Sequence, residues 1–274
     1  MTSELPRRIL PAGACDAHLH LYDPSLINAP PASHPLSACD VSRYSALRTD
    51  LGLSRAVIVT PAPHRVDNRV TLAAIQALGP DASRGVAVVF PDVSDKELER
   101  LHAGGIRGIR FTLAIPATAV TRIDMVEPLA SRVHEMGWHI QLHMTPGQIA
   151  SHRELLERLP CTLVFDHMAR LADAGHDGTA WPVIESLLDN GKTWVKLSGH
   201  YLAGSKQQAA ETANRLIEYR PDRLVWGSDW PHPTEFPTPP ATSTTLDALF
   251  EWAPDEALRQ RILVENPEQL YGFA

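Results

Sequence analysis

The sequence predicts an α/β protein with a closed (β/α)₈ barrel, and three observations support this fold class. Eight short runs rich in Val, Ile and Leu recur along the 274-residue chain. The segments between these runs are long enough to hold a helix, and this alternation is typical of repeated strand–helix units. Most runs are apolar over several consecutive residues, as expected of parallel strands that are buried on both faces.

Each strand is predicted where one of these apolar runs lies between polar, Gly or Pro residues. In chain order the runs are Ala14–His20, Arg55–Pro61, Gly85–Pro91, Gly105–Thr112, His139–Met144, Thr162–Met168, Thr193–Gly199 and Arg223–Asp229. Helix signals occur between them. Residues 92–105 read DVSDKELERLHAGG, with acidic residues early and a Gly pair at the end, and residues 185–192 read ESLLDNGK, with a Gly close to the end.

An open, doubly wound sheet is the alternative arrangement of the same elements. The Gly-rich phosphate loop that usually follows the first strand of such a sheet is absent from the sequence, which favours the barrel. No shift in composition marks a domain boundary, so residues 1–274 are predicted to form a single domain. Two Pro-rich stretches, Asp23–Pro35 and Pro231–Pro240, are predicted to be loops at the C-terminal face of the barrel.

The charge balance limits the partners of the protein. The chain carries 25 Lys and Arg against 32 Asp and Glu, for a formal net charge of -7, which argues against binding nucleic acid. No apolar run approaches the roughly 18 residues of a membrane span, and no apolar signal segment follows the N-terminus. We expect a cytoplasmic protein that acts on a small molecule. Whether its copies form a homo-oligomer is left open.

Polar side chains occur where the predicted strands end, which in a (β/α)₈ barrel is the face that carries the active site. His18 and His20 end the first run, and they point the same way because strand side chains alternate with a period of two. His143 ends the fifth run, His167 lies in the sixth, and Asp229 ends the eighth. Neutral imidazoles and a carboxylate suit zinc or a similar divalent cation.

Each of these residues alone also has a structural explanation. A His-x-His pair in a strand occurs by chance, a single core histidine is commonly satisfied by hydrogen bonds, and His167 and Asp229 alone could be capping or structural hydrogen-bonding groups at strand ends. Their joint placement at several strand ends is what indicates a site. The following histidines are instead predicted to be mainly solvated: His34, His64, His102, His134, His139, His152 and His176.

Six short motifs relate this pattern to a known group of enzymes. They are CDAHLH at residues 15–20, GIRF at 108–111, FDHM at 165–168, KLSG at 196–199, GSDWPH at 227–232 and VENPEQLYGF at 264–273. Together they resemble the amidohydrolase superfamily over nearly the whole chain. More narrowly, the chain resembles the amidohydrolase-related branch, which includes lactonases for pyrone, muconate-type and sugar-acid substrates and a lactone isomerase.

The resemblance implies a catalytic and metal-binding set. Asp229 corresponds to the eighth-strand aspartate that handles the proton, and His167 to the sixth-strand histidine. The pyrone lactonases of the branch work without a metal and lack a fifth-strand histidine, whereas His143 stands where metal-dependent members place a ligand. We therefore expect one divalent metal ion, Zn or Mn, on His18, His20, His143 and Asp229, with catalysis without a metal as the alternative. A second ion lacks its bridging ligand.

The resemblance also implies how the substrate is held. Arg110 in GIRF and Arg170 correspond to arginines that bind a substrate carboxylate. Further arginines of the pyrone lactonases are replaced here by TLAIP and HYLAG, so a substrate with several carboxylates is disfavoured. Tyr201 and His232, in the segments after the seventh and eighth strands, are candidates for contacts to substrate hydroxyls.

The expected function is hydrolysis of a small carboxylated lactone, such as a sugar-acid or muconate-type lactone. Opening a lactone needs an activated water, stabilisation of the oxyanion and a proton for the leaving oxygen, and this set of residues supplies all three. The alternatives within the superfamily are a lactone isomerase and a metal-dependent decarboxylase. The alternative outside enzymes is a barrel that binds a ligand without turning it over.

Overall fold

The computed structural model of the chain describes residues 9–26, 39–173 and 178–273. Eight parallel strands pair in chain order from β1 to β8, which confirms the predicted barrel order. Their bounds are β1 Cys15–Leu19, β2 Arg55–Val59, β3 Ser83–Ala87, β4 Ile106–Thr112, β5 His139–His143, β6 Thr162–Phe165, β7 Thr193–Leu197 and β8 Leu224–Trp226.

Backbone hydrogen bonds just beyond β8 bring its end back to β1. Asp229 N donates to His18 O over 2.8 Å, and His20 N donates to Trp230 O over 2.8 Å. Leu19 and Trp230 form an isolated parallel bridge at the same place. The barrel is therefore closed by the segment that carries the candidate residues His18, His20 and Asp229.

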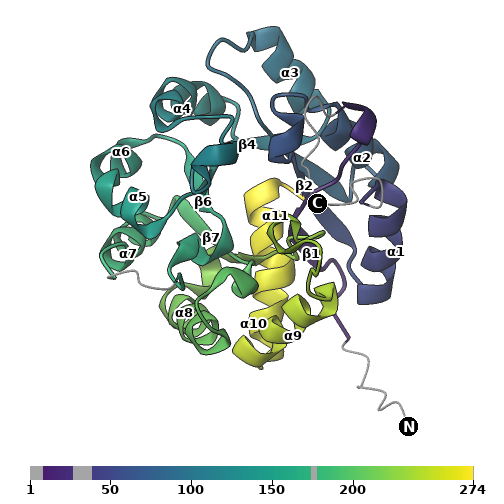
Figure 1. Cartoon of the computed structure of the whole chain (residues 1–274), viewed down its shortest axis with the longest axis vertical. Coiled ribbons are helices and arrows are strands. Elements are labelled where there is room, and N and C mark those ends of the chain that lie inside the picture. Colours follow the sequence, from purple (N-terminus) through teal and green to yellow (C-terminus); the bar gives the residue numbers. More distant parts are fainter. Residues whose placement is uncertain (1–8, 27–38, 174–177, 274) are drawn as a thin grey trace.

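Helices surround the strands in the view of Figure 1. Their bounds are α1 Val41–Leu51, α2 Arg69–Leu78, α3 Asp95–Ala103, α4 Val126–Glu135, α5 Pro146–Ser151, α6 Arg153–Arg158, α7 Trp181–Asp189, α8 Lys206–Tyr219, α9 Thr242–Trp252, α10 Glu256–Gln260 and α11 Asn266–Tyr271, with a π-helix at Arg261–Glu265. Both helices signalled in the sequence form, and Ser94 caps α3 by accepting from Glu97 N. Within the described ranges, none of the helices has the length and apolarity needed to span a bilayer.

The strand β3, Ser83–Ala87, begins two residues before the predicted run Gly85–Pro91 and ends four residues before the end of that run. It begins at Ser83, which pairs with Ala56 of β2. Its end follows from the side chain of Asn68, which accepts from Val88 N over 2.9 Å and donates to Val88 O over 2.9 Å. The amide of Asn68 thus occupies the backbone groups that a longer strand would use.

Two layers of apolar side chains form the core. The inner cluster contains Cys15, Ala17, Val57, Val164 and Val225 from four strands, and it also includes Tyr271 and Phe273 near the C-terminus. The larger outer cluster joins the opposite strand faces to the helices. This two-sided burial explains why the strands are nearly continuous apolar runs.

The structure describes only some residues of the two predicted Pro-rich loops. Residues 27–38 of the first predicted loop lie outside the described residues. The second, Pro231–Pro240, does lie between β8 and α9 and contains a short 3₁₀ turn at Pro233–Glu235. Phe236 from this loop packs against a small cluster of Tyr22 and Cys39, which follow β1, so the loop lies at the end of the barrel where the strands terminate.

Two of the histidines predicted to be solvated are buried, so that prediction was wrong for them. His64 accepts from Asp23 N through Nε2 at 3.3 Å, and only 2% of it is exposed. His139 is also 2% exposed, because it begins β5 and its ring fills the space beside Gly108, where a Cβ would lie 2.4 Å from the ring. His102 and His134 are exposed and His152 is half-buried; His34 and His176 lie outside the described residues.

The buried His139 should make the stability of the protein fall in acid. Burial, with a further contribution from the charge of Lys196, lowers its pKa from 6.5 to about 3. The unfolded chain therefore takes up a proton below pH 6.5 that the folded chain does not, and stability is lost as pH falls from 6.5 toward 3.

We expect this residue alone to lower the free energy of unfolding by up to about 1.4 kcal/mol per pH unit across that window. Urea unfolding at several pH values should give a shallower acid dependence for His139→Gln than for the wild type. The exposed His134→Gln is the control. Equal slopes for wild type and His139→Gln would show that His139 is not the residue responsible.

Candidate active site

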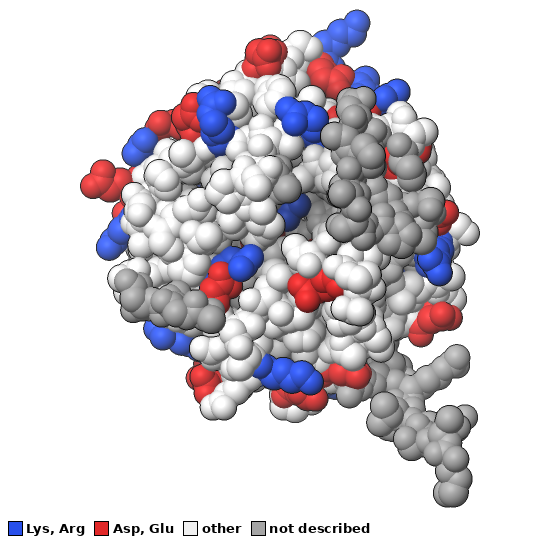
Figure 2. All heavy atoms as spheres, viewed as in Figure 1, with Lys and Arg blue, Asp and Glu red and all other residues white. Residues whose placement is uncertain are grey.

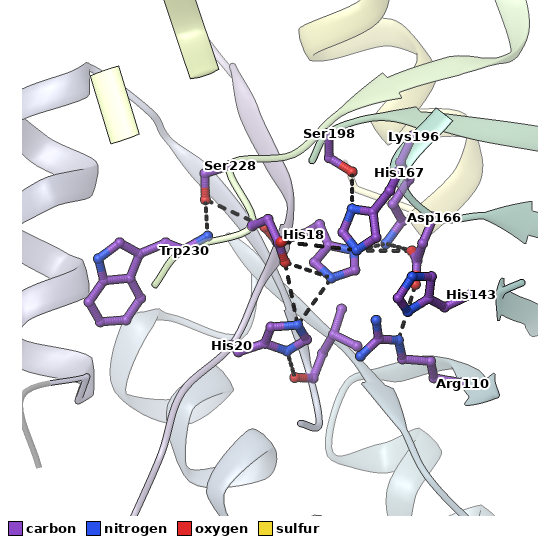
Figure 3. A network of polar contacts seen from close by, with 12 residues as sticks. His18, His20, Arg110, His143, Asp166, His167, Lys196, Ser198, Ser228 and Trp230 are labelled. Atoms are coloured by element: carbon purple, nitrogen blue, oxygen red, sulfur yellow. Dashed lines mark hydrogen bonds and ion pairs between the residues drawn. The ribbon is translucent and has the colours of Figure 1, made fainter. Parts of the chain in front are cut away.

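The predicted site residues meet at the C-terminal ends of the strands. His18 lies in β1 and His20 follows it, while His143 ends β5 and Asp229 follows β8. All four are at most 4% exposed. Figure 3 shows His18, His20, His143 and His167 around one space, with Arg110 at its side. The expectation that these strand ends converge is confirmed.

An irregularity in β1 turns the two histidines toward this space. The pairing of β1 with β2 shifts register between Asp16 and Leu19. Before the shift Cys15 and Ala17 belong to the inner cluster, whereas the carboxylate of Asp16 accepts from Tyr44 on α1 and from the hydroxyl of Ser228 at 2.6 Å. After the shift His18 faces inward.

The segment that follows β8 lies close to β1 at this irregularity. A Cβ at Gly227 would lie 2.5 Å from the Cβ of His18, a separation that no side chain tolerates. Only glycine therefore allows the chain after β8 to lie against His18. The glycine of the GSDWPH motif therefore has a structural role, in addition to the chemical role expected of the aspartate.

A buried set of charges lies directly beneath the histidines. Asp166 accepts from Arg110 Nε at 3.1 Å and from Gln141 Nε2 at 3.1 Å, both through Oδ2. Lys196 Nζ donates to Ala17 O at 2.9 Å and to Gln141 Oε1 at 2.7 Å, and it lies 3.7 Å from Asp166. The strands β1, β4, β5 and β7 and the end of β6 are joined by these contacts.

Both members of the Asp166–Lys196 pair are charged at neutral pH. Burial opposes ionisation of Asp166, but its contacts with His18, Arg110 and Lys196 outweigh this effect and hold the pKa of Asp166 well below its ordinary value. Burial lowers the pKa of Lys196 to about 8, against the opposing attraction of Asp166. The guanidinium of Arg110 adds a second positive charge to one carboxylate.

Sequence reasoning assigned no role to Lys196, and it placed Asp166 only among the polar residues at the ends of the strands. A signal was present, because Lys196 lies within a predicted strand that is otherwise apolar and a lysine is almost never fully buried without a partner. The sequence motif KLSG could therefore have predicted a buried ion pair. Its partner could not be named from spacing alone, since β6 and β7 are brought together only by the fold.

The protonation of His20 is fixed by its surroundings. Its Nδ1 lies 2.8 Å from Val59 O, and a carbonyl only accepts, so Nδ1 carries the proton and Nε2 presents a lone pair. For His18, Nδ1 lies between the acceptor Asp166 Oδ1 at 3.1 Å and the donor Lys196 Nζ at 3.2 Å. Either nitrogen of His18 can therefore carry the proton. When Nδ1 carries it and donates to Asp166, Nε2 of His18 also presents a lone pair.

Three potential metal-ligand atoms, from His18, His20 and Asp229, therefore lie close together. His18 Nε2 lies 3.2 Å from His20 Nε2, and Asp229 Oδ1 lies 3.4 Å from the first and 3.5 Å from the second. Ligand atoms in a tetrahedral zinc site lie about 3.3 Å apart, given metal–ligand lengths of about 2.0 Å. Asp229 Oδ1 is buried and lacks a hydrogen-bond partner among the described residues. This group of buried residues fits one divalent cation.

His143 is absent from that group of ligands. Its ring lies edge-on to His167 at 4.9 Å between centroids, and its Nε2 lies 3.4 Å from Arg170 Nη1. A second group of atoms, from His18, Asp166 and His167, also lies close together. Its carboxylate is already paired with the positive charges of Arg110 and Lys196, which leaves little attraction for a second ion.

Asp229 and His167 differ in how they are held. Burial raises the pKa of Asp229 to about 7, and a hydrogen bond from Tyr201 works against that rise. His167 hydrogen-bonds through Nδ1 to Ser198 Oγ at 3.0 Å, and its Nε2 lies 4.0 Å from Asp229 Oδ2. Burial is the largest cause that keeps the pKa of His167 well below 6.5, so its ring is neutral.

The remaining predicted site residues line the same region with other partners. Arg170 donates to Asp173 at 2.7 Å. Tyr201 donates its hydroxyl to Asp229 Oδ2. His232 is buried, bonds through Nε2 to Thr242 Oγ1 at 3.0 Å, and packs edge-on against the ring of Tyr201. In Figure 2 the face shown is hollowed near its centre, and Lys or Arg atoms lie in the hollow.

Residues 15–273 match the Amidohydrolase family, and the chain belongs to this family. A 2-pyrone-4,6-dicarboxylate hydrolase of Comamonas testosteroni is 33% identical over 97% of this chain and 92% of the relative. A 4-sulfomuconolactone hydrolase of Rhizobium radiobacter is 30% identical over 96% and 91%. A D-galactarolactone isomerase of Agrobacterium fabrum is 29% identical over 100% and 96%.

Solved structures share the same architecture. A ligand-free Agrobacterium tumefaciens protein superposes with a TM-score of 0.88 at 27% identity, covering 98% of this chain and 99% of that one. A probable 2-pyrone-4,6-dicarboxylic acid hydrolase of Acinetobacter baumannii, solved with citric acid bound, gives 0.83 at 26% identity over 95% and 100%. The (β/α)₈ TIM-barrel fold expected from the sequence is confirmed.

A left-handed turn after β6 orients His167 and Arg170. Residues His167, Met168, Ala169 and Arg170 have φ between 52 and 57°, a conformation that costs non-glycine residues about 1–2 kcal/mol each. The sequence contains no glycine here to signal it. The turn holds the two side chains toward the site at the expense of local stability.

Glycine at Ala169 should relieve this cost. Ala169→Gly and Ala213→Gly, the latter within α8, each remove a buried methyl group, but only the helical position loses favourable helix propensity, about 1 kcal/mol. We expect Ala169→Gly to be less destabilising than Ala213→Gly by about 2 kcal/mol in urea unfolding. Equal losses would contradict the left-handed turn.

Proposed function

We propose that this protein is a hydrolase that opens a lactone of a small carboxylated substrate, such as a sugar-acid or muconate-type lactone. The observation that carries the proposal is a buried carboxylate, Asp229, whose pKa of about 7 suits a group that takes and returns a proton near neutral pH. Relatives that bear lactone hydrolase names and align over more than nine-tenths of the chain support it.

Asp229 acts first as base and then as acid. Its carboxylate takes a proton from water while the water oxygen attacks the lactone carbonyl carbon. When the tetrahedral intermediate collapses, the ring C–O bond breaks and Asp229 returns the proton to the departing alkoxide. The product is an open hydroxy acid, and the carboxylate is restored.

His167 is proposed to stabilise the negative charge that develops on the carbonyl oxygen. Its Nδ1 contact with Ser198 leaves Nε2 directed toward Asp229, from which it lies 4.0 Å. A neutral imidazole donating from Nε2 is a suitable partner for an oxyanion. In a metal-free reaction His18 would share this role, because its Nε2 can carry a proton.

We propose one divalent ion, Zn or Mn, on His18, His20 and Asp229. When bound, such an ion supplies Lewis-acid polarisation of the attacked carbonyl. His143, the fourth ligand implied by the resemblance, lies outside the convergent group and is not part of this proposal. His167, Arg110 and Arg170 keep the roles proposed for them, because none of these side chains is among the proposed ligands.

The substrate carboxylate is proposed to bind between Arg110 and Arg170. Planar guanidinium groups suit carboxylates, and Arg110 extends from β4 into the site at 5% exposure. Asp166 accepts from Nε of Arg110, and the two positive charges of Arg110 and Lys196 exceed the single negative charge of Asp166. The site therefore favours an anion.

A lactone isomerase is the second candidate, because a D-galactarolactone isomerase aligns with the whole chain. It needs the same oxyanion and proton-transfer groups, but a substrate hydroxyl replaces water as the attacking group. Proton NMR of the product distinguishes a migrated ring from an opened one. Carbon dioxide release would instead identify the decarboxylase alternative.

Asp229→Asn should abolish most of the turnover. The amide cannot accept the proton, and we expect kcat to fall by at least about 100-fold with little loss of stability. Turnover is measured with a pH indicator on a panel of sugar-acid and muconate-type lactones. Asp124→Asn, which changes an exposed carboxylate paired with Arg122, is the control and should keep wild-type activity. Unchanged turnover in Asp229→Asn would refute the proposed base.

Elemental analysis of protein purified without added ions should find about one equivalent of Zn or Mn. Because an ion that binds only the folded chain stabilises it, adding the ion at about 100 times its Kd should raise the free energy of unfolding by about 2.7 kcal/mol. His20→Ala should lose the bound ion, whereas the exposed His134→Ala should keep it. A fully active protein without metal would remove the ion from the proposal and leave Asp229 as base.

A further inference from the structure

Tyr201 contacts Asp229, the proposed base, directly. It belongs to the 3₁₀ turn His200–Leu202 that follows β7, and its hydroxyl donates a hydrogen bond to Asp229 Oδ2. The sequence suggested a contact from Tyr201 to a substrate hydroxyl. In the structure its hydroxyl is used by a carboxylate of the chain itself.

This contact makes the two oxygens of Asp229 unequal. Oδ1 faces His18 Nε2 at 3.4 Å and His20 Nε2 at 3.5 Å, and it has no hydrogen-bond partner in the part of the chain that the structure describes. Oδ2 has its donor in Tyr201. A carboxylate with one oxygen held in this way cannot rotate freely, so the open oxygen stays directed at the two histidines.

Tyr201 is itself held by residues of neighbouring loops. The ring of His232 packs edge-on against it at 5.2 Å and that of His200 at 5.7 Å between centroids. His232 is fixed by Thr242 at the start of α9, and His200 packs on Trp252 at the end of the same helix. The position of the hydroxyl is therefore determined by packing from both sides.

We propose that Tyr201 is a positioning residue that orients Asp229, rather than a residue that binds substrate hydroxyls. It holds Oδ2 so that Oδ1 remains available toward His18 and His20. Its effects on kinetics and on metal affinity rest on the proposed function, whereas its effect on the orientation of Asp229 does not.

Tyr201→Phe removes only the hydroxyl and is the direct test. Loss of such an outer contact to an active-site ligand typically costs about 10–100-fold in activity, so we expect kcat to fall by that factor with KM unchanged within about twofold. Tyr219→Phe is the matched control, because Tyr219 also donates to a carboxylate, Asp189, but at the surface. A raised KM with unchanged kcat would overturn the proposal in favour of a substrate contact, and unchanged values of both would overturn it outright.

Two further readouts separate this proposal from the lactonase proposal. If the wild type opens no lactone, calorimetric titration with zinc is expected to show about tenfold weaker binding to Tyr201→Phe than to the wild type. A crystal structure of the variant needs neither metal nor substrate, and it should show Asp229 rotated or in two orientations. An Asp229 side chain that stays in place with unchanged zinc affinity would overturn the proposal.

Thr242→Val provides the same test without altering Tyr201. It removes the hydroxyl that fixes His232 and should lower kcat in the same direction by a smaller factor, with KM unchanged. This variant keeps the proposal testable should Tyr201→Phe fail to fold. Wild-type kcat in a folded Thr242→Val would contradict the claim that His232 holds Tyr201 in position.

Discussion

The buried carboxylate of Asp166 is the group on which the arrangement of the site depends. It is fully enclosed and paired with Arg110 at 3.1 Å and Lys196 at 3.7 Å, which come from β4 and β7. A charge in such a place costs several kcal/mol unless partners satisfy it. The strand ends must therefore stay close enough for these pairs to form, and the histidines above them are positioned as a consequence.

This pairing also gives the two carboxylates at the site, Asp166 and Asp229, different chemical properties. Asp166 has its negative charge neutralised by the chain, so it is a poor metal ligand and a poor base. Asp229 has no cationic side chain within salt-bridge distance among the described residues other than the imidazoles of His18, His20 and His167. Its pKa near 7 and its open Oδ1 are the properties on which the roles proposed for it in proton transfer and metal binding rest.

The sequence was sufficient for the barrel and for the convergence of His18, His20, His167 and Asp229, because continuous apolar strands and strand-end polar residues are local patterns. It was insufficient where geometry depends on contacts between distant segments. The irregularity of β1 depends on the close approach of Gly227, and burial of His139 depends on the space beside Gly108. The partner of Lys196 and the contact of Tyr201 with Asp229 likewise follow only from the assembled barrel.

A double-mutant cycle on Asp166 and Lys196 tests the central claim most directly. The free energy of unfolding is measured for Asp166→Asn, Lys196→Met and the double variant. Removing either partner should cost about 3–5 kcal/mol, because the other charge is left buried and less compensated. The double variant should lose less than the sum of the two by at least about 1 kcal/mol. Additive losses would contradict the claim that this buried pair holds the site together.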